Sequence, residues 1–209
     1  MKKNGEKKNM ITEKDITTLW GTYLNQIQDG DLRDKVVKTW IEGCRQGGWT
    51  NLAQLQKMPF TLATDHQGIS FIEHTRAVTQ GALGLAQAQL QNYEHHPYSI
   101  DLDRVIAGGL LHDIGKLLEI ESDHRDGWRM SPAGKCLRHP ISGAILAQRA
   151  GVPEAILNII ACHAKEGEGR SQVVETVLVH QADFATFTPL VMMKNNKLIT
   201  DEIHGTNPD

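Results

Sequence analysis

The sequence predicts an all-α fold, in which one helical domain follows a shorter helical extension. Apolar residues recur every three or four positions over most of the 209 residues, as expected for amphipathic helices. Capping residues, glycines and prolines separate these stretches and indicate where helices begin and end. The sequence has no alternating pattern long enough for a useful strand, and its 40% hydrophobic residues suffice for a buried core.

The first third predicts two helices and a connector. An apolar stripe over residues 16–27 predicts the first helix, which Asp29-Gly30 interrupts. A second stripe over residues 32–41 predicts a helix that continues until Gly47-Gly48. Residues 49–68 are expected to form a connector that contains one short helix.

The central part predicts two helices followed by a loop. Ser70 and Glu73 have the spacing of a capping box, so a helix should begin there and continue to about residue 91. Glycines and alanines in this helix would let a neighbouring helix approach closely. Asp101 or Asp103 can cap the next helix. Residues 119–138 are polar and rich in glycine and proline, and we expect a loop there.

The C-terminal third predicts three more helices. Their expected limits are 140–150, 153–163 and about 172–186, with Ser171 near the start of the last one. Pro189 is expected to end that helix, because proline lacks the backbone N–H that a helix interior needs.

These elements divide the chain into four predicted segments. Residues 1–14 carry five lysines against two glutamates and are expected to be a flexible basic terminus. Residues 15–64 would form the N-terminal helical extension and residues 65–190 the main helical domain. A C-terminal tail over residues 191–209 would follow. The role of the first 64 residues and the oligomeric state stay open.

Composition and charge exclude several classes of function. With a formal net charge of −3, the chain offers no large basic face, so DNA binding is not expected. No apolar run approaches the roughly 20 residues that cross a bilayer, and the lysine-rich start lacks the apolar region of a secretory signal. We therefore expect a cytoplasmic protein without a membrane partner.

Histidine is abundant and cysteine is scarce. The chain has ten histidines but only three cysteines, and the cysteines form no Cys-x-x-Cys pair. A disulfide scaffold and a cysteine-rich zinc finger are therefore not expected. If the histidines bind metal, carboxylates must be their partners.

The strongest local motif is His112-Asp113-Ile114-Gly115-Lys116, at the end of an apolar helix. Histidine and aspartate are costly in a helix packed into a core unless their polar atoms find partners. Both side chains can reach one ion over the edge of the helix, with a nitrogen from His112 and an oxygen from Asp113.

Four further residues occupy comparable positions on other predicted helices. Each is a polar group at the edge of a segment otherwise suited to burial: His74, His139, His163 and Asp183. Helices that converge with imidazole and carboxylate groups can form a metal site inside a bundle. The six residues together therefore predict a metal site.

In this order, the six residues resemble the signature of the HD-domain superfamily of metal-dependent phosphohydrolases. The resemblance covers roughly residues 65–190 and is most specific at the His-Asp-Ile-Gly-Lys motif and at Asp183. It implies an HD-domain helical bundle. The additional histidines resemble the subset of this superfamily that holds two divalent metal ions.

The resemblance also implies a role for each residue. His74, His112, Asp113 and Asp183 would hold the first ion. Asp113 would bridge to a second ion, which His139 and His163 would also hold. Lys116 matches the lysine that faces the phosphate, so Asp113 and Lys116 are the predicted catalytic residues. Imidazole and carboxylate ligands favour Mn, Fe, Co or Ni, with Mg or Zn as alternatives.

The predicted function is hydrolysis of a phosphomonoester or phosphodiester in a small, nucleotide-like phosphorylated substrate, by a hydroxide shared between the ions. Two alternatives stay open: an HD-fold di-iron oxygenase, and a non-catalytic signalling or binding module stabilised by metal. Cyclic-dinucleotide phosphodiesterases of this superfamily carry paired histidines followed by Gly-Tyr-Pro. The segment after His163 lacks both features, which argues against that activity.

The remaining histidines and the tryptophans receive simpler interpretations. His180, one turn before Asp183, is a candidate for supporting a ligand. Five histidines are expected in surface or loop positions: His66, His95, His96, His124 and His204. Three tryptophans are expected to pack the N-terminal helices: Trp20, Trp40 and Trp49.

Overall fold

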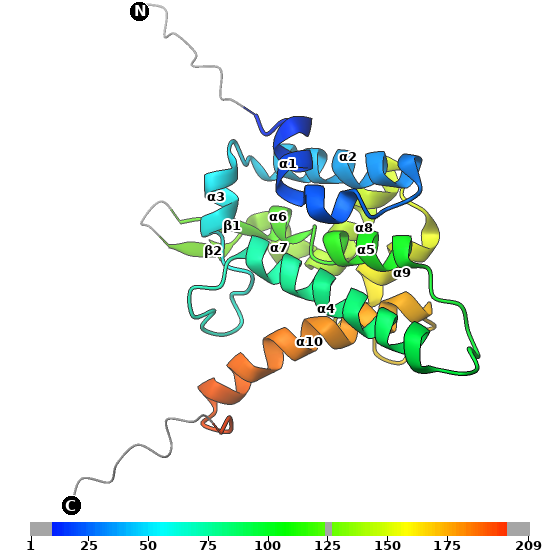
Figure 1. Cartoon of the computed structure of the whole chain (residues 1–209). Coiled ribbons are helices and arrows are strands. Elements are labelled where there is room, and N and C mark those ends of the chain that lie inside the picture. The colour runs from blue at the N-terminus through cyan, green and yellow to red at the C-terminus, as the bar shows by residue number, and fades with distance from the viewer. Residues whose placement is uncertain (1–9, 124–126, 200–209) are drawn as a thin grey trace, which may run out of the picture.

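The computed structural model describes residues 10–123 and 127–199, which form a helical bundle with one small hairpin (Figure 1). The all-α prediction is confirmed. Most of the predicted basic terminus, His124 and the end of the predicted tail with His204 lie outside the described residues. The elements are α1 (Glu13–Leu24), α2 (Gly30–Gly47), α3 (Leu52–Lys57), α4 (Phe71–Asn92), α5 (Leu102–Leu111), α6 (Lys116–Glu119), β1 (Ile120–Ser122), β2 (Trp128–Met130), α7 (Pro132–Cys136), α8 (His139–Ala150), α9 (Glu154–Cys162), the 3-10 turn η1 (Lys165–Gly167) and α10 (Val174–Lys194).

Side-chain caps define the starts of several helices. Asp29, which we expected only to break the first helix, accepts hydrogen bonds from two backbone N–H groups at the start of α2. Ser70 and Glu73 form the predicted capping box of α4. The cap of α5 is Asp101, whereas Asp103 accepts the backbone N–H groups of residues 28 and 29 and so ties the α1–α2 turn to α5.

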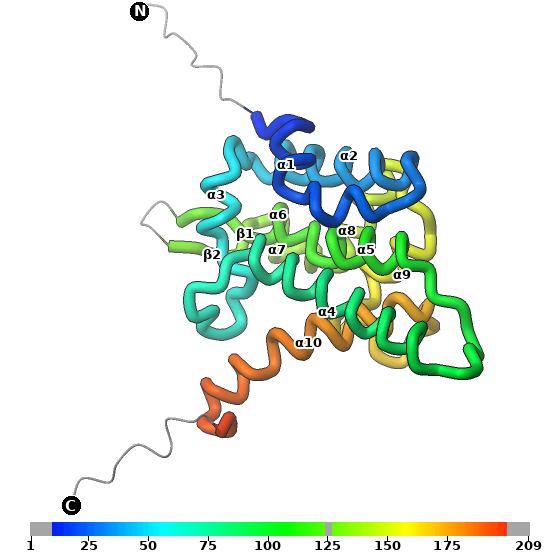
Figure 2. The backbone as a smooth tube through the Cα atoms, viewed as in Figure 1, coloured from blue at the N-terminus to red at the C-terminus, as the bar shows by residue number. Residues whose placement is uncertain are grey.

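The long helices are stacked across the molecule. Figure 2 shows α1 and α2 on one side, α10 on the opposite side, and α4 and α5 between them. Helix α4 packs against both α5 and α10. Close approach depends on small residues: a Cβ on Gly109 of α5 would lie 2.8 Å from Cα of Thr79 on α4. Of the small residues predicted on α4, Gly81 faces α10, where a Cβ would lie 3.3 Å from Cβ of Ala182, whereas Gly84 has no neighbour within 4 Å.

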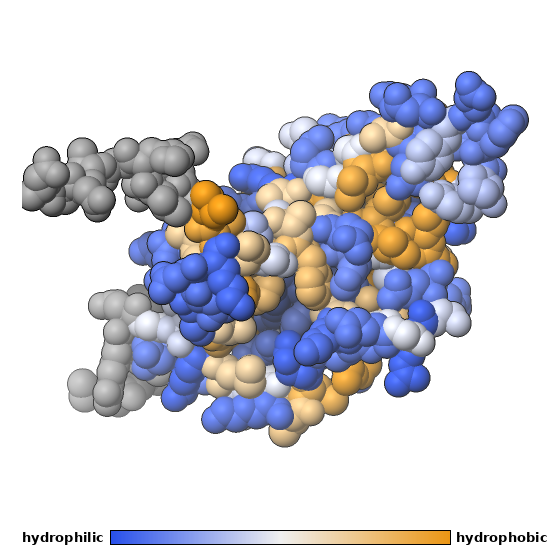
Figure 3. Space-filling view, turned by 90° about the horizontal axis from the view of Figure 1, so that it is seen from below, coloured by the Kyte–Doolittle hydropathy of each residue, from blue (hydrophilic) through white to orange (hydrophobic). Residues whose placement is uncertain are grey.

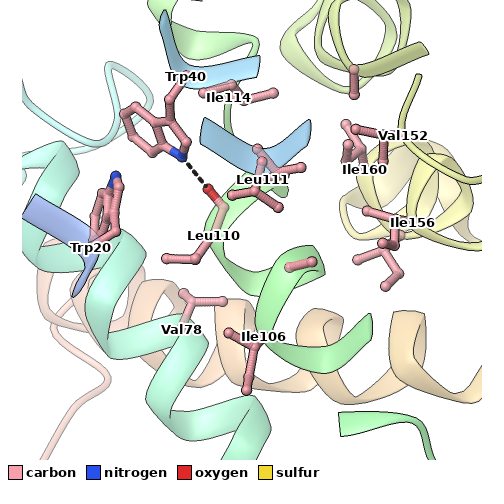
Figure 4. Packing of buried hydrophobic residues seen from close by; sticks show 14 of the residues in the cluster. Trp20, Trp40, Val78, Ile106, Leu110, Leu111, Ile114, Val152, Ile156 and Ile160 are labelled. Carbon is pink, nitrogen blue, oxygen red and sulfur yellow. Dashed lines mark hydrogen bonds between the residues drawn. The ribbon is translucent and has the colours of Figure 1, made fainter. Parts of the chain in front are cut away.

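The N-terminal helices share one hydrophobic core with the helices that follow. The Trp20 and Trp40 ring centroids lie 5.0 Å apart, and Trp40 lies 5.6 Å from Phe71 at the start of α4. The Trp40 indole N–H also donates to the Leu110 carbonyl oxygen at 3.2 Å (Figure 4). All three aromatic side chains are buried, so the prediction that Trp20 and Trp40 pack these helices is confirmed. Trp49 is also buried.

The prediction of a loop over residues 119–138 is wrong in part. This segment contains the β1–β2 hairpin, in which Ile120 pairs with Met130, and the short helix α7. Strands of three residues are too short to show an alternating pattern. Ser131 caps α7 by accepting the backbone N–H of Gly134.

The limits predicted for the last helix are also wrong. Pro189 lies inside α10, which continues to Lys194. An internal proline removes one helical hydrogen bond, but Leu190 beyond it is buried, so packing favours continuation of the helix. At the other end, Val173 rather than Ser171 precedes the first helical residue.

The predicted domain boundaries remain predictions. Because α10 continues to Lys194, this helix crosses residue 190, where we placed the start of the tail. Among the described residues, no helix combines the length and the apolar character that spanning a bilayer requires.

Candidate metal centre

The structure brings the six predicted ligand residues together from five parts of the bundle. His74 lies on α4, His139 is the first residue of α8 and Asp183 lies on α10. His112 and Asp113 follow α5, and His163 follows α9. Five of the six residues are buried, and the Asp183 side chain is 15% exposed.

Local structure explains why the His-Asp-Ile-Gly-Lys motif turns at this point. His112 is the C-cap of α5, and tight turns then connect it to α6. Gly115 lets α8 come very close, because a Cβ at this position would lie 2.1 Å from the backbone oxygen of His139. The motif therefore places Asp113 beside a ligand from another helix.

The first group of candidate ligands consists of His74, His112 and Asp183. Nε2 of His74 lies 3.2 Å from Oδ1 of Asp183 and 3.4 Å from Nε2 of His112. The three ligand atoms lie within 4.8 Å of one another, so a single ion could contact all of them.

The second group consists of Asp113, His139 and His163, and Asp113 joins it to the first. Oδ1 of Asp113 lies 3.1 Å from Nε2 of His139 and 3.5 Å from Nε2 of His163. Its other oxygen, Oδ2, lies 3.2 Å from Nε2 of His74 and 3.3 Å from Nε2 of His112. Each oxygen of this one carboxylate therefore faces a different group of histidines.

In each of the four candidate ligand histidines, Nδ1 faces an oxygen atom that can accept a hydrogen bond from the ring N–H. His112 and His163 face the backbone oxygens of Gly109 at 2.7 Å and Ile160 at 2.9 Å, respectively. Nδ1 of His139 lies 3.3 Å from the Glu119 carboxylate.

Thr186 completes this pattern at His74. Its hydroxyl lies 3.3 Å from Nδ1 of His74 and donates its own hydrogen to the Asp183 backbone oxygen at 2.8 Å. The hydroxyl oxygen is thus left to accept the ring N–H. With Nδ1 protonated in every neutral ring, all four Nε2 lone pairs point into the centre.

These lone pairs fit a cation. Oδ1 of Asp113 and Nε2 of His163 are buried without a hydrogen-bond partner, whereas Oδ2 of Asp113 forms an ion pair with Lys116. Buried unpaired acceptors that face one another at 3.1–3.5 Å repel and lose hydration. Divalent cations between them would remove this repulsion and replace the lost hydration, so the residues present fit a metal centre.

Burial and neighbouring charges favour the metal-binding forms of three candidate ligands, Asp113, Asp183 and His139. Burial alone would raise the pKa of Asp113, but Lys116, His112 and His139 outweigh it and hold this pKa well below its ordinary value. For Asp183, burial is the largest single effect and would raise the pKa, but the hydrogen bond with His74 and the interactions with His112 and His163 together lower the pKa to about 2. Burial lowers the pKa of His139 more than the negative charge of Asp113 raises it, and so favours the neutral ring.

Lys116 lies beside the centre. Its Nζ is 2.5 Å from Oδ2 of Asp113 and 5.6 Å from the ring centroid of Phe60. Its side chain is 12% exposed and borders a cavity of about 620 Å³ that also exposes Asp113, His139 and Asp183. The cavity therefore gives a substrate access to the predicted ligands and to the predicted catalytic lysine.

The cavity is lined by charged residues of both signs and by apolar residues. Arg138 and Lys165 contribute positive charge, and Arg138 lies 3.5 Å from Glu119 and 3.9 Å from Glu166. Leu62, Phe184 and Phe187 supply apolar surface. Figure 3 views the molecule from the side on which α10 lies and shows a recess, with hydrophilic residues deep inside and hydrophobic residues beside it.

Sequence reasoning missed three residues that support this site: Glu119, Arg138 and Thr186. Glu119 is buried and contacts His139, and the interaction with this ring outweighs burial and lowers the pKa of Glu119. Its position one turn after Lys116 was a usable signal, but only with α6 recognised as a helix. Thr186 lies three residues after Asp183, and this spacing alone does not indicate a contact with His74.

The other histidines lie outside the two candidate groups. Nδ1 of His180 donates to the backbone oxygen of His163 at 2.5 Å, which matches the supporting role predicted for it. His95 and His96 are exposed, as predicted. His66 lies in the loop before α4 and is half-buried.

Fold and centre together define a helical protein with a buried histidine–aspartate site. The family described as HD domain matches residues 71–185, which is more than half of the chain. The chain therefore belongs to the HD-domain superfamily of metal-dependent phosphohydrolases, as the sequence predicted.

The chain is similar to ribonucleases over less than half of its length and over a small part of theirs. Ribonuclease Y of Pseudothermotoga lettingae is 37% identical over 98 residues, and that of Thermotoga maritima is 35% identical over 96. Each match covers 46% of this chain and 16% of the relative. Ribonuclease Y of Borreliella burgdorferi is 40% identical over 74 residues, which cover 35% of this chain and 12% of the relative. No solved structure matches the chain.

Proposed function

We propose that this protein is a phosphohydrolase with a binuclear metal centre, which cleaves a phosphomonoester or phosphodiester bond in a small, nucleotide-like substrate. The observation that carries the proposal is the position of Asp113. Its two buried oxygens face separate groups of histidines, as a bridging carboxylate requires.

Each group would hold one divalent ion. His74, His112 and Asp183 would ligate the first ion together with Oδ2 of Asp113. His139 and His163 would ligate the second with Oδ1. Bound divalent ions would supply a water of lowered pKa and neutralise charge on phosphoryl oxygens. Imidazole and carboxylate donors favour Mn, Fe, Co or Ni, and they also accept Zn or Mg.

The residues that line the cavity favour a substrate with one anionic end and one apolar end. Lys116, Arg138 and Lys165 would bind the anionic phosphate and hold it against the metal ligands. The apolar surface of Leu62, Phe184 and Phe187 would contact a flat, apolar group such as a nucleobase.

The ribonuclease relatives favour a phosphodiester as the bond that is cleaved. Their name refers to RNA cleavage by those proteins, and the match covers 46% of this chain and 16% of the relative. We propose that the shared element is the hydrolytic chemistry. The cavity suits one nucleotide unit, and DNA binding is still not expected because the net charge is −3.

A direct assay tests this function against its two alternatives. Metal-free protein would be supplied with Mn²⁺, Co²⁺ or Fe²⁺ and a panel of nucleoside monophosphates, dinucleotides and nitrophenyl phosphates. Release of phosphate or nucleotide is expected. Oxygen consumption with Fe²⁺ and no hydrolysis would indicate an oxygenase, and metal binding without either activity would indicate a non-catalytic module.

Replacing Lys116 by glutamine is expected to lower kcat by about 100-fold, because one positive group no longer faces the phosphoryl oxygens. Metal content should stay unchanged, since Lys116 is not among the candidate ligands. Steady-state kinetics and metal analysis would measure both effects. Lys135→Gln, at an exposed position on α7, is the matched control. Equal kcat values for the two variants would contradict the role of Lys116.

A further inference from the structure

We propose that Glu119 is a positioning residue that sets the affinity of the second metal position, the one formed by Asp113, His139 and His163. The inference rests on the proposed binuclear centre. It adds that the two positions depend on different supporting residues, so the second can be weakened selectively.

One oxygen of Glu119 holds His139 in two ways. Oε2 accepts the backbone N–H of His139 at 2.6 Å and lies 3.3 Å from Nδ1 of the same residue. His139 is the first residue of α8, whose N-cap residue, Arg138, makes no side-chain capping bond. Glu119 therefore supplies a partner that the start of this helix needs, and it directs the ring of a candidate ligand.

The end of α6 is held firmly in place. A Cβ on Gly134 of α7 would lie 2.8 Å from both Cα and Cγ of Glu119, so the two segments are in close contact. The Ser131 backbone N–H donates to the Glu119 carbonyl oxygen at 2.8 Å, and the Ser131 hydroxyl donates to that of Leu118 at 2.5 Å. These contacts fix the backbone of Glu119 next to His139, and Nε of Arg138 also lies 3.5 Å from Oε2 of the carboxylate.

The supporting partner of His139 differs from those of the other three histidines. His112 and His163 donate to backbone oxygens, and His74 faces a threonine hydroxyl, all of which are uncharged. Only His139 among these four has a carboxylate at Nδ1. A carboxylate makes the ring a stronger ligand, and loss of such a partner costs about 10- to 100-fold in metal affinity. This loss should fall on the second position.

The test is a metal titration of Glu119→Gln. Metal-stripped protein would be titrated calorimetrically with Mn²⁺ and, in parallel, with Co²⁺ followed by its absorption spectrum. The wild type should bind two ions per chain. In Glu119→Gln, one ion should bind with unchanged affinity and the other about 10- to 100-fold more weakly.

Glu175→Gln is the matched control. Glu175 is also buried and its carboxylate also accepts one backbone N–H, that of Asp101 at 2.9 Å. It lies on α10 about 12 Å along the helix axis from Asp183. This variant should lose stability in thermal unfolding but keep both metal affinities, which separates a general structural effect from the proposed one.

A milder variant keeps the proposal testable if Glu119→Gln does not fold. Glu119→Asp retains the charge on a side chain that is one carbon shorter, and it should weaken the second ion selectively but less strongly. Equal weakening of both ions in either variant, or unchanged affinities in Glu119→Gln, would overturn the role of Glu119. Wild-type protein that binds fewer than two ions would instead overturn the binuclear centre, and this inference with it.

Discussion

Replacing Asp113 by asparagine is expected to abolish binding of both metal ions and to lower hydrolytic activity by about a thousandfold, equivalent to about 4 kcal/mol. The amide has nearly the shape of the carboxylate, but its nitrogen has no lone pair for a metal and its oxygen carries no full charge. One of the two candidate groups therefore loses a ligand, and both lose the negative charge between them. Metal analysis and phosphate release would measure these effects.

Asp103→Asn provides the comparison for this variant. Asp103 also lies in the bundle and accepts two backbone N–H groups, at 2.9 and 2.8 Å, but it is not among the candidate ligands. The Asp103→Asn variant should therefore retain two ions per chain. If Asp113→Asn also retained two ions at full affinity, Asp113 would not be the bridging ligand.

Replacing Gly115 by alanine is expected to lower the free energy of unfolding of the metal-free protein by about 3 kcal/mol. The backbone dihedral angles of Gly115, φ −65° and ψ −19°, suit any residue, so conformational strain is not the cause. The new Cβ would lie 2.1 Å from the backbone oxygen of His139 and 2.7 Å from the Gly143 nitrogen. Helix α8 must move away, which also displaces His139. Urea denaturation would measure the loss of stability.

Gly84→Ala on α4 is the appropriate control for this substitution. A Cβ at Gly84 has no neighbour within 4 Å, and the residue is exposed in a helix. Alanine should therefore stabilise the protein by about 0.5–1 kcal/mol. An equally mild effect of Gly115→Ala would show that α6 and α8 are not packed as tightly as the geometry indicates.

Much of the fold could be predicted because it depends on local signals. The capping box of Ser70 and Glu73 and the glycine after α8, Gly151, are determined by short-range backbone chemistry. The six candidate ligands were recognisable because polar groups recur in apolar helical segments. The bundle brings five of them together from at or near helix ends, and Asp183 from the middle of α10. Their role as metal ligands stays a proposal.

The remaining features depend on contacts between distant residues. The hairpin of β1 and β2 gains its pairing from residues ten positions apart, such as Ile120 and Met130, and each strand is too short to leave a pattern. The continuation of α10 past Pro189 depends on tertiary packing, which overrides a strong local preference. Glu119 was not predicted because its function depends on a residue twenty positions later, His139.

The central claim is that two divalent ions at this centre catalyse hydrolysis of a phosphate ester. The most direct measurement is a titration of metal-free protein with Mn²⁺ while product release from a nitrophenyl phosphate ester or a dinucleotide is followed. We predict no activity without metal and full activity at two ions per chain. Full activity at one ion per chain, or no hydrolysis at any metal content, would contradict it.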